Sequence, residues 1–282
     1  MEDITAYRYF FDQKWPYGFR CPRCNHSEYT TISTRRLPLY QCRFCKHQTT
    51  LTAGTVMERS RTPLEKWVQA IELLSSTGGI NAVQLAVALQ ISYKCAWGML
   101  RSFRRAISNI EASRRLSGYV RAGLQFLGAR YFLMYVRQPR QHAIVIGASF
   151  NSNTGAPIEI KLHYVPVYHL NEMKRLTREG KECFFERHVD PRSASNFLPY
   201  AKMNIYEPLQ QCFQEVQAWL NRLYHGLGAR SLQSYLDEYC FRWNGAARRG
   251  DQRRQWLDIC FFRSADISFN QHVSKHVLPA VI

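Results

Sequence analysis

Two cysteine pairs, Cys21-Pro22-Arg23-Cys24 and Cys42-Arg43-Phe44-Cys45, are separated by seventeen residues and determine the fold of the first part of the chain. Two residues between cysteines allow a tight turn to direct both sulfurs at one point, and two such turns build a closed tetrahedral site. The intervening stretch from Tyr29 to Tyr40 is suited to short strands. The pattern predicts a zinc ribbon whose structural zinc is bound by Cys21, Cys24, Cys42 and Cys45. Because all four positions are filled, the site has no open coordination for catalysis.

Alternatives stay open for these cysteines. The two pairs could be coincidental or form a reducible disulfide, and His26 or His47, each two residues past a pair, could replace a cysteine as ligand. We favour surface positions for both histidines, because four well-spaced cysteines already complete the site. The remaining cysteines are scattered singly and are expected to pack as small apolar groups: Cys95, Cys183, Cys212, Cys240 and Cys260.

Length and composition set the broad class of the protein. The chain has 282 residues, enough for two or three domains, and a formal net charge of +17. A hydrophobic content of 46% excludes a wholly disordered chain. The excess charge favours nucleic acid as the partner, with an anionic membrane surface as the weaker alternative. No apolar stretch approaches the ~18 residues of a membrane span and the N-terminus lacks a signal-peptide pattern, so we expect a cytoplasmic protein.

Three helices are predicted after the cysteine pairs. Thr62-Pro63-Leu64-Glu65 is a helix-start signal, and Gly78-Gly79 ends that first helix. Asn81 can cap a second helix. Ser92 can cap a third helix, which runs to about Ile107. The expected buried positions are Trp67, Ala70, Ile71 and Leu74, then Val83, Leu85, Ala86 and Leu89, then Ala96, Leu100, Phe103 and Ile107. Two short helices joined by a three- or four-residue turn predict a helix-turn-helix.

The third helix is the predicted recognition helix. Between Arg59 and Arg115 there are nine basic residues against three acidic ones. We expect the major groove to be contacted by Tyr93, Lys94 and Trp97, and phosphates by Arg101, Arg104 and Arg105. The alternative is an ordinary helical bundle whose solvated face is basic.

These segments resemble a known family. Residues 15–24, 40–45 and 48–55, together with the start of the third helix at 91–97, are similar to insertion-sequence transposases that open with a zinc ribbon. Later segments resemble the C-terminal signature of that family: His225-Gly226-Leu227, residues 232–239 and Phe241-Arg242-Trp243-Asn244. The resemblance implies an ISXO-type, ribonuclease-H-like domain of the DDE class, which carries two aspartates and a third Glu, Asn or His.

The acidic residues of that class are missing from the corresponding strand. The stretch from Gly118 to Ala129 has Gly123 at the position of the first aspartate, Leu124 at the neighbouring glutamate and Arg121 at the preceding acid. Strand transfer needs clustered carboxylates that hold two divalent metals ~4 Å apart, so little chemistry should remain. The weak remaining candidates are Glu186, Asp190 and Glu215, which we expect to be solvated surface groups rather than metal ligands.

The strands and helices of this domain are nevertheless predicted to be kept. Residues 141–150 and 157–166 have strand patterns joined by a hairpin, and 209–224 is a helix with a broad apolar stripe. The basic stretch Ala246 to Arg263 has two interpretations: a second contact to the DNA backbone, or a solubilising face or flexible linker. Its arginines are Arg248, Arg249, Arg253, Arg254 and Arg263.

The sequence therefore predicts an α+β multidomain protein. Its parts are a β zinc ribbon at 1–56, a helix-turn-helix at 57–112, a degenerate α/β ribonuclease-H-like domain at 113–245 and a basic tail at 246–282. The expected function is transposase-like binding of double-stranded DNA without strand transfer, in a chain that can form homo-oligomers and uses no membrane. The alternatives are an active transposase that cuts and joins DNA ends with two Mg²⁺ ions, and a zinc-ribbon regulator that binds RNA or another protein.

Overall fold

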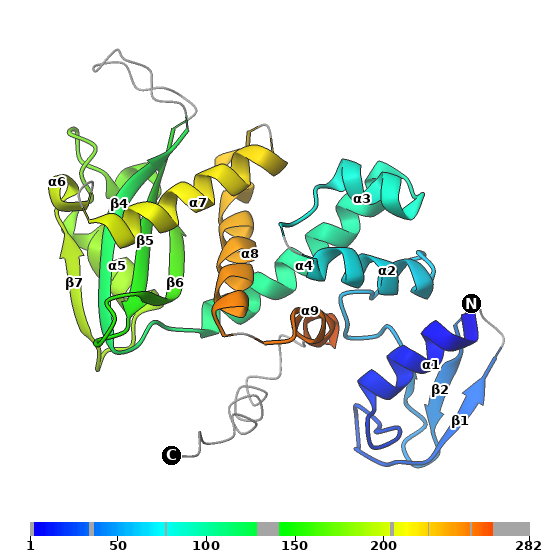
Figure 1. Ribbon diagram of the computed structural model, residues 1–282. Coiled ribbons are helices and arrows are strands. Elements are labelled where there is room, and N and C mark those ends of the chain that lie inside the picture. Colours follow the sequence, from blue (N-terminus) through cyan, green and yellow to red (C-terminus); the bar gives the residue numbers. More distant parts are fainter. Residues whose placement is uncertain are drawn as a thin grey trace. The chain divides into compact units, whose positions relative to one another are not determined.

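The computed structural model describes residues 3–33, 37–76, 78–128, 141–203, 206–224, 226–248 and 250–261 (Figure 1). The fold is mixed α+β, and the chain divides into two compact units. The first unit comprises Met1–Thr77, Ala82–Ala106 and Arg253–Ile282, and the second Gly78–Asn81 and Ile107–Gln252. In the described part of the chain, no helix has both the length and the apolar character needed to span a membrane. His225, Arg249 and Arg263 lie outside the described residues.

A small antiparallel sheet follows the first helix, α1 (Asp3–Lys14). Its strands are β1 (Tyr29–Ile32), β2 (Leu39–Cys42) and β3 (Gln48–Thr50), in the order β1-β2-β3. Aromatic rings supply its core: the Trp15 and Tyr40 centroids are 5.1 Å apart, and those of Phe19 and Tyr29 4.8 Å. At the end of α1, the Lys14 ammonium donates to the carbonyl oxygens of Thr50, Leu51 and Ala53. The Phe11 ring of α1 lies 5.6 Å from that of Tyr40, so α1 and the ribbon are joined by both apolar and polar contacts.

The three helices expected after the ribbon are present as α2 (Leu64–Ser75), α3 (Ala82–Leu89) and α4 (Tyr93–Ser113). The Ser92 hydroxyl caps α4 by accepting from the backbone N–H of Cys95 at 3.2 Å. Gln90, with φ at 52°, ends α3 in the left-handed conformation. Helix α4 extends to Ser113, beyond the predicted end near Ile107.

One predicted core position in α3 is wrong. Val83 is exposed, whereas Leu85 and Leu89 are fully buried. An eight-residue helix has little more than two turns, so only residues four apart share its buried face, and Val83 points away from it.

Part of the stretch expected to be a basic tail is a packed helix. Helix α9 (Gln252–Phe261) buries Trp256 and Cys260 in the first unit, and the backbone N–H of Val56 donates to the carbonyl of Cys260 at 3.0 Å. The Trp256 ring also contacts Phe103 of α4 at 5.7 Å between centroids. The sequence interpretation relied on the arginines of this segment and missed the apolar residues that recur at helical spacing.

A mixed sheet of four strands forms the centre of the second unit. Strands β4 (Tyr119–Leu127), β5 (His142–Phe150) and β6 (Pro157–Tyr164) are antiparallel neighbours. Strand β7 (Ala194–Leu198) runs parallel to β4 with Leu198 opposite Gly123, which gives the order β6-β5-β4-β7. A short 3-10 helix, η1 (Val167–His169), and α5 (Arg178–His188) connect β6 to β7.

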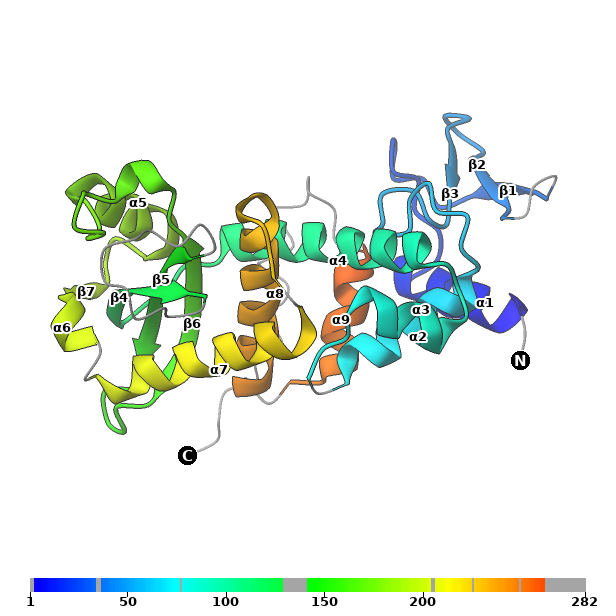
Figure 2. The same ribbon diagram turned by 90° about the horizontal axis from the view of Figure 1, so that it is seen from above.

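Helices cover both faces of this sheet, as Figures 1 and 2 show. Alternate residues of β5 take opposite sides: Ile144 and Ile146 pack with α7 (Glu207–Leu223), and Val145 packs with Phe184 of α5. The short helix α6 (Tyr200–Met203) links β7 to the segment before α7 and places Met203 in the core on the α7 side. Two hydrophobic cores therefore lie on either side of one sheet.

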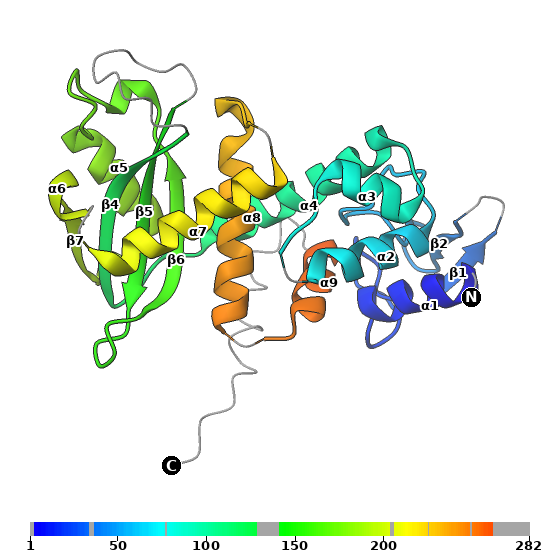
Figure 3. The same ribbon diagram turned by 45° about the horizontal axis from the view of Figure 1, so that its top comes forward.

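Helix α8 (Ala229–Ala247) closes the outer edge of β6 (Figure 3). The Asn244 amide accepts from the backbone N–H of Ile160 at 2.8 Å and donates to the carbonyl of the same residue at 3.1 Å. The Gln233 amide makes the same pair of contacts with Tyr164 and Leu162. Because an open edge strand invites pairing with another chain, these two amides protect the sheet.

Candidate functional site

The four cysteines of the two pairs converge on one point. Their Sγ atoms all lie within 4.8 Å of one another, with 3.6 Å between Cys21 and Cys45 and 3.6 Å between Cys24 and Cys42. A tetrahedral zinc ion with Zn–S bonds of ~2.3 Å has S–S edges of ~3.8 Å. The residues present therefore fit Zn²⁺. Neither His26 nor His47 is a member of the cluster.

The two cysteine turns have the same backbone geometry. The N–H of Asn25 donates to the carbonyl of Cys21 and that of Lys46 to the carbonyl of Cys42, with Asn25 and Lys46 both in the left-handed region. Burial raises the pKa of the Cys21 thiol, but the backbone amides of Arg23 and Cys24 and the neighbouring thiols outweigh it and lower that pKa to about 7. The turn thus directs N–H groups at a sulfur, which favours the thiolate that a metal requires.

Comparison with family models supports this centre. Residues 1–48 match the transposase zinc-ribbon domain of the IS1595 type. The matched region contains all four cysteines and ends at the start of β3. Comparisons with curated proteins and with solved structures gave no match. The ribbon is therefore similar to the zinc ribbons of transposases, and its four clustered cysteines support a structural zinc.

The predicted DNA-contacting residues occupy the start and middle of α4. Tyr93, Lys94, Trp97, Arg101 and Arg105 are exposed, and the Arg101 guanidinium lies over the Trp97 ring at 5.2 Å from its centroid. A cavity of about 500 Å³ adjoins this surface, with basic side chains in its lining. These are Arg59, Arg61 and Lys94.

Arg104 was predicted to contact phosphate, and its burial corrects this prediction. Its side chain is only 5% exposed because position 104 lies beside Phe103 and Ile107 on the buried face of α4. Arginine and lysine are almost never fully buried without partners. Arg104 is therefore not presented to a ligand.

The strand that carries Gly123 has no acidic side chain on the face toward α7. A Cβ at Gly123 would lie 2.9 Å from Cγ of Met203 and still closer to its Sδ, so methionine fills the space beside the glycine. Two residues on, Gln125 donates to Gln210 of α7 at 3.0 Å. Two residues back, the Arg121 guanidinium donates to the Tyr119 hydroxyl and lies 4.6 Å from the Tyr206 ring centroid. The face of β4 toward α7 therefore carries the Met203 sulfur, the Gln125–Gln210 amide pair and the Arg121 guanidinium.

The three weak carboxylate candidates are not brought together. Glu186 is exposed on α5 and Glu215 is exposed on α7, with the sheet between these helices (Figures 1 and 2). Asp190 accepts from Arg192, whose hydrogen bonds lower the pKa of that carboxyl to about 2. Among the residues that the structure describes, the four cysteines are the one group that meets metal-binding geometry.

Glu207 was not singled out from the sequence. It is the first residue of α7, one helical turn before Gln210, and so lies closer along this helix to the β4 contact than Glu215 does. Glu207 is exposed and has no second carboxylate on the adjacent face of β4. The available signal was its place at a helix start, next to Pro208.

Replacing Gly123 with alanine is expected to destabilise the second unit by about 1–3 kcal/mol, since the added methyl group overpacks against Met203. Met203→Ala alone should cost about 2–5 kcal/mol through the cavity it leaves. In the double variant the two changes should partly compensate, which a double-mutant cycle on hydrogen-exchange protection of β4 would measure. Additive effects would mean that the two side chains do not share this space.

Proposed function

We propose that this protein is a transposase-like DNA-binding protein that cannot catalyse strand transfer. The observation that carries the proposal is the combination of a transposase-type zinc ribbon with a β4 face on which Met203 packs against Gly123. The mixed sheet covered by α5 and α7 is compatible with a ribonuclease-H-like domain. In this proposal the domain is kept as a scaffold while the metal-binding acids are lost.

Double-stranded DNA is the proposed partner of α4. Lys94 and Trp97 lie in the first two turns of a helix that follows a tight turn, which is where a recognition helix contacts base edges. Arg101 and Arg105 lie one and two turns further along the exposed surface and suit phosphates. A formal net charge of +17 assists association with any polyanion. The zinc, bound by Cys21, Cys24, Cys42 and Cys45, holds the ribbon in shape and leaves no position for a substrate.

Lys94→Ala and Arg101→Ala are each expected to weaken duplex binding about tenfold, because each variant loses one base or phosphate contact. Fluorescence anisotropy with a 20-base-pair duplex at fixed salt measures this. Arg178→Ala, which removes an arginine whose side chain is 87% exposed on α5, is the control and should bind as the wild type does. Equal binding by all four proteins would refute the proposed DNA surface.

Cleavage assays separate the proposal from the active-transposase alternative. Because the described residues hold no metal-binding cluster of carboxylates, the purified protein should neither cut nor join DNA ends in Mg²⁺ or Mn²⁺. Metal-dependent cleavage that is lost in Glu207→Gln would show that the catalytic acids are present and were misassigned. Competition between duplex DNA and duplex RNA tests the regulator alternative, which predicts that the protein binds RNA more tightly than DNA. The domain boundaries, a homo-oligomer and a cytoplasmic location stay predictions.

A further inference from the structure

The tip of the second cysteine turn carries an exposed aromatic ring. Phe44 is 75% exposed between two zinc ligands, and its ring lies 5.7 Å from that of His26, just past the first turn. Exposed basic side chains surround it: Arg43 beside it, Lys46 after it and Arg23 at the tip of the facing turn. We call His26, Phe44 and these three cations the knuckle platform. A large apolar ring held in water by a rigid metal-centred turn indicates a binding role rather than a packing role.

The charge of the ribbon narrows the choice of partner. Residues 13–56 contain seven basic side chains and a single acidic one, Glu28. Its carboxylate lies 3.9 Å from both His26 and Arg43, at the outer limit of an ion pair. Surface ion pairs of this kind contribute little, so the positive charge stays available to a ligand. A polyanion that carries flat rings satisfies both the cations and the exposed phenyl group.

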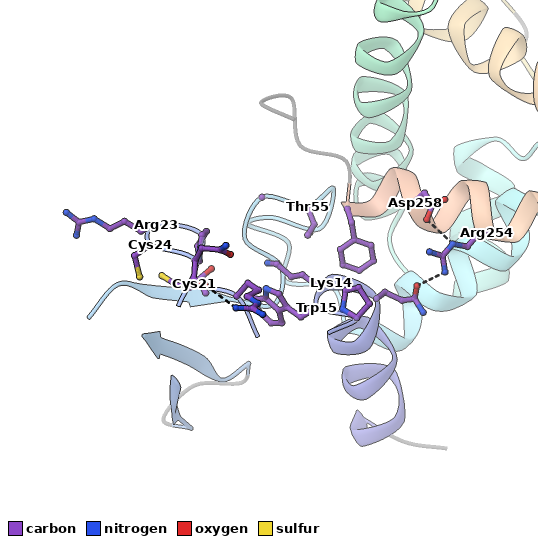
Figure 4. A pocket seen from close by; sticks show the side chains of 16 residues that line it. Lys14, Trp15, Cys21, Arg23, Cys24, Thr55, Arg254 and Asp258 are labelled. Atoms are coloured by element: carbon purple, nitrogen blue, oxygen red, sulfur yellow. Dashed lines mark hydrogen bonds and ion pairs between the residues drawn. The ribbon is translucent and has the colours of Figure 1, made fainter. Parts of the chain in front are cut away.

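A groove of about 610 Å³ lies beside the first cysteine turn (Figure 4). Trp15, Pro16 and Pro22 contribute to its lining, and Arg23 and Cys24 connect it to the knuckle platform. Its other side is α9, where Arg254 pairs with Asp258 at 3.0 Å. The Arg23 side chain extends away from the groove in Figure 4. The groove offers a strand that leaves the platform a path lined by both apolar and basic side chains.

We propose that the knuckle platform binds unpaired bases of single-stranded DNA. Phe44 stacks on a base, while Arg23, Arg43 and Lys46 contact the neighbouring phosphates, the combination by which proteins hold single strands. Base faces inside a duplex are already stacked on one another, so Phe44 selects unpaired bases. The choice of DNA over RNA rests on the proposed function, whereas the choice of unpaired bases rests on Phe44 itself.

Phe44→Ala is expected to weaken binding of a 20-nucleotide oligo(dT) by about tenfold, within the range of one lost base–aromatic stack. Phe44→Tyr should restore the affinity, because it restores an aromatic ring. Tyr168→Ala removes an equally exposed ring from the second unit, at 77% exposure, and should have no effect. Anisotropy of the full-length, zinc-loaded protein is the measurement. Since Phe44 makes no buried contact that holds the fold, zinc content should stay at the wild-type level in all variants.

Further oligonucleotides separate the components of the proposal. A 20-nucleotide abasic strand, which keeps the phosphates and lacks the bases, should bind about tenfold more weakly than oligo(dT). Equal binding of the two strands, or unchanged oligo(dT) binding by Phe44→Ala, would overturn the proposal. Tighter binding of oligo(U) than of oligo(dT) would overturn the choice of DNA. Lys94→Ala should leave oligo(dT) binding intact, so a failure of the duplex surface on α4 is distinguishable from a failure of the platform.

Discussion

Cys42→Ala is expected to abolish zinc binding and unfold the ribbon from Cys21 to Gln48. Cys42 is fully buried at the end of β2, and its Sγ lies 3.6 Å from that of Cys24. Removing one of four ligands destroys a tetrahedral site, and structural zinc contributes on the order of 10 kcal/mol to small domains of this kind. In the described part of the ribbon, three short strands, the aromatic cluster around Tyr40 and the contacts to α1 contribute less than a metal centre of that size.

Two measurements check this expectation. Metal analysis should give one zinc per chain for the wild type and none for Cys42→Ala, and hydrogen exchange should show loss of protection in β1, β2 and β3. Cys95→Ala, which removes an exposed cysteine of α4 outside the cluster, is the control and should keep both zinc and protection. Retention of one zinc per chain in Cys42→Ala would contradict the assignment of Cys42 as a ligand.

Lys161→Met is expected to destabilise the second unit by about 3–5 kcal/mol, the usual cost of leaving a buried charge without its partner. Lys161 of β6 forms an ion pair with Glu111 of α4, and each side chain is 3% exposed. The Lys161 ammonium also donates to the backbone carbonyl of Glu111 at 2.7 Å. The pair therefore ties the last turn of α4 to the sheet, and its loss leaves the buried Glu111 carboxylate paired with the partly exposed Arg114 in place of a buried ammonium.

Hydrogen exchange of β5 and β6 in the full-length protein measures the loss. The double variant Lys161→Met with Glu111→Leu should recover most of the stability, because no unpaired charge remains. Arg114→Ala, which removes the partly exposed second partner of Glu111, should cost about 1 kcal/mol or less. Lys161→Met should also raise the pKa of Asp237, already raised to about 6 by burial, since Lys161 lowers it. Unchanged protection in Lys161→Met would show that the pair is solvated.

The best-predicted parts are those in which a short pattern determines the chemistry. The spacing of Cys21, Cys24, Cys42 and Cys45 was enough to place a metal cluster, because each pair lies within one turn and a hairpin joins the two. The Ser92 cap and the buried positions Leu100 and Phe103 of α4 were also foreseen, since capping and helical periodicity are local properties. Strand and helix patterns likewise indicated an α+β protein.

Predictions that depended on burial fared less well. Arg104 was assigned to phosphate because it is an arginine on a basic helix, yet its position on the helix buries it. Helix α9 was hidden by its arginines, although Trp256 and Cys260 pack in the first unit. Sequence periodicity shows that a helix has an apolar face, but it does not show which other element packs against that face.

The sequence by itself determined the zinc-binding cluster, the helices α2, α3 and α4, and the absence of an acid at position 123. The tertiary structure alone decided that Met203 fills the space beside Gly123, that Lys161 meets Glu111, and that Gln233 and Asn244 close the edge of β6. These contacts join residues 50 to 84 positions apart, as in Lys161–Glu111 and Ile160–Asn244. Local patterns carry no information about such pairs, because only the packing of sheet against helix brings them within reach.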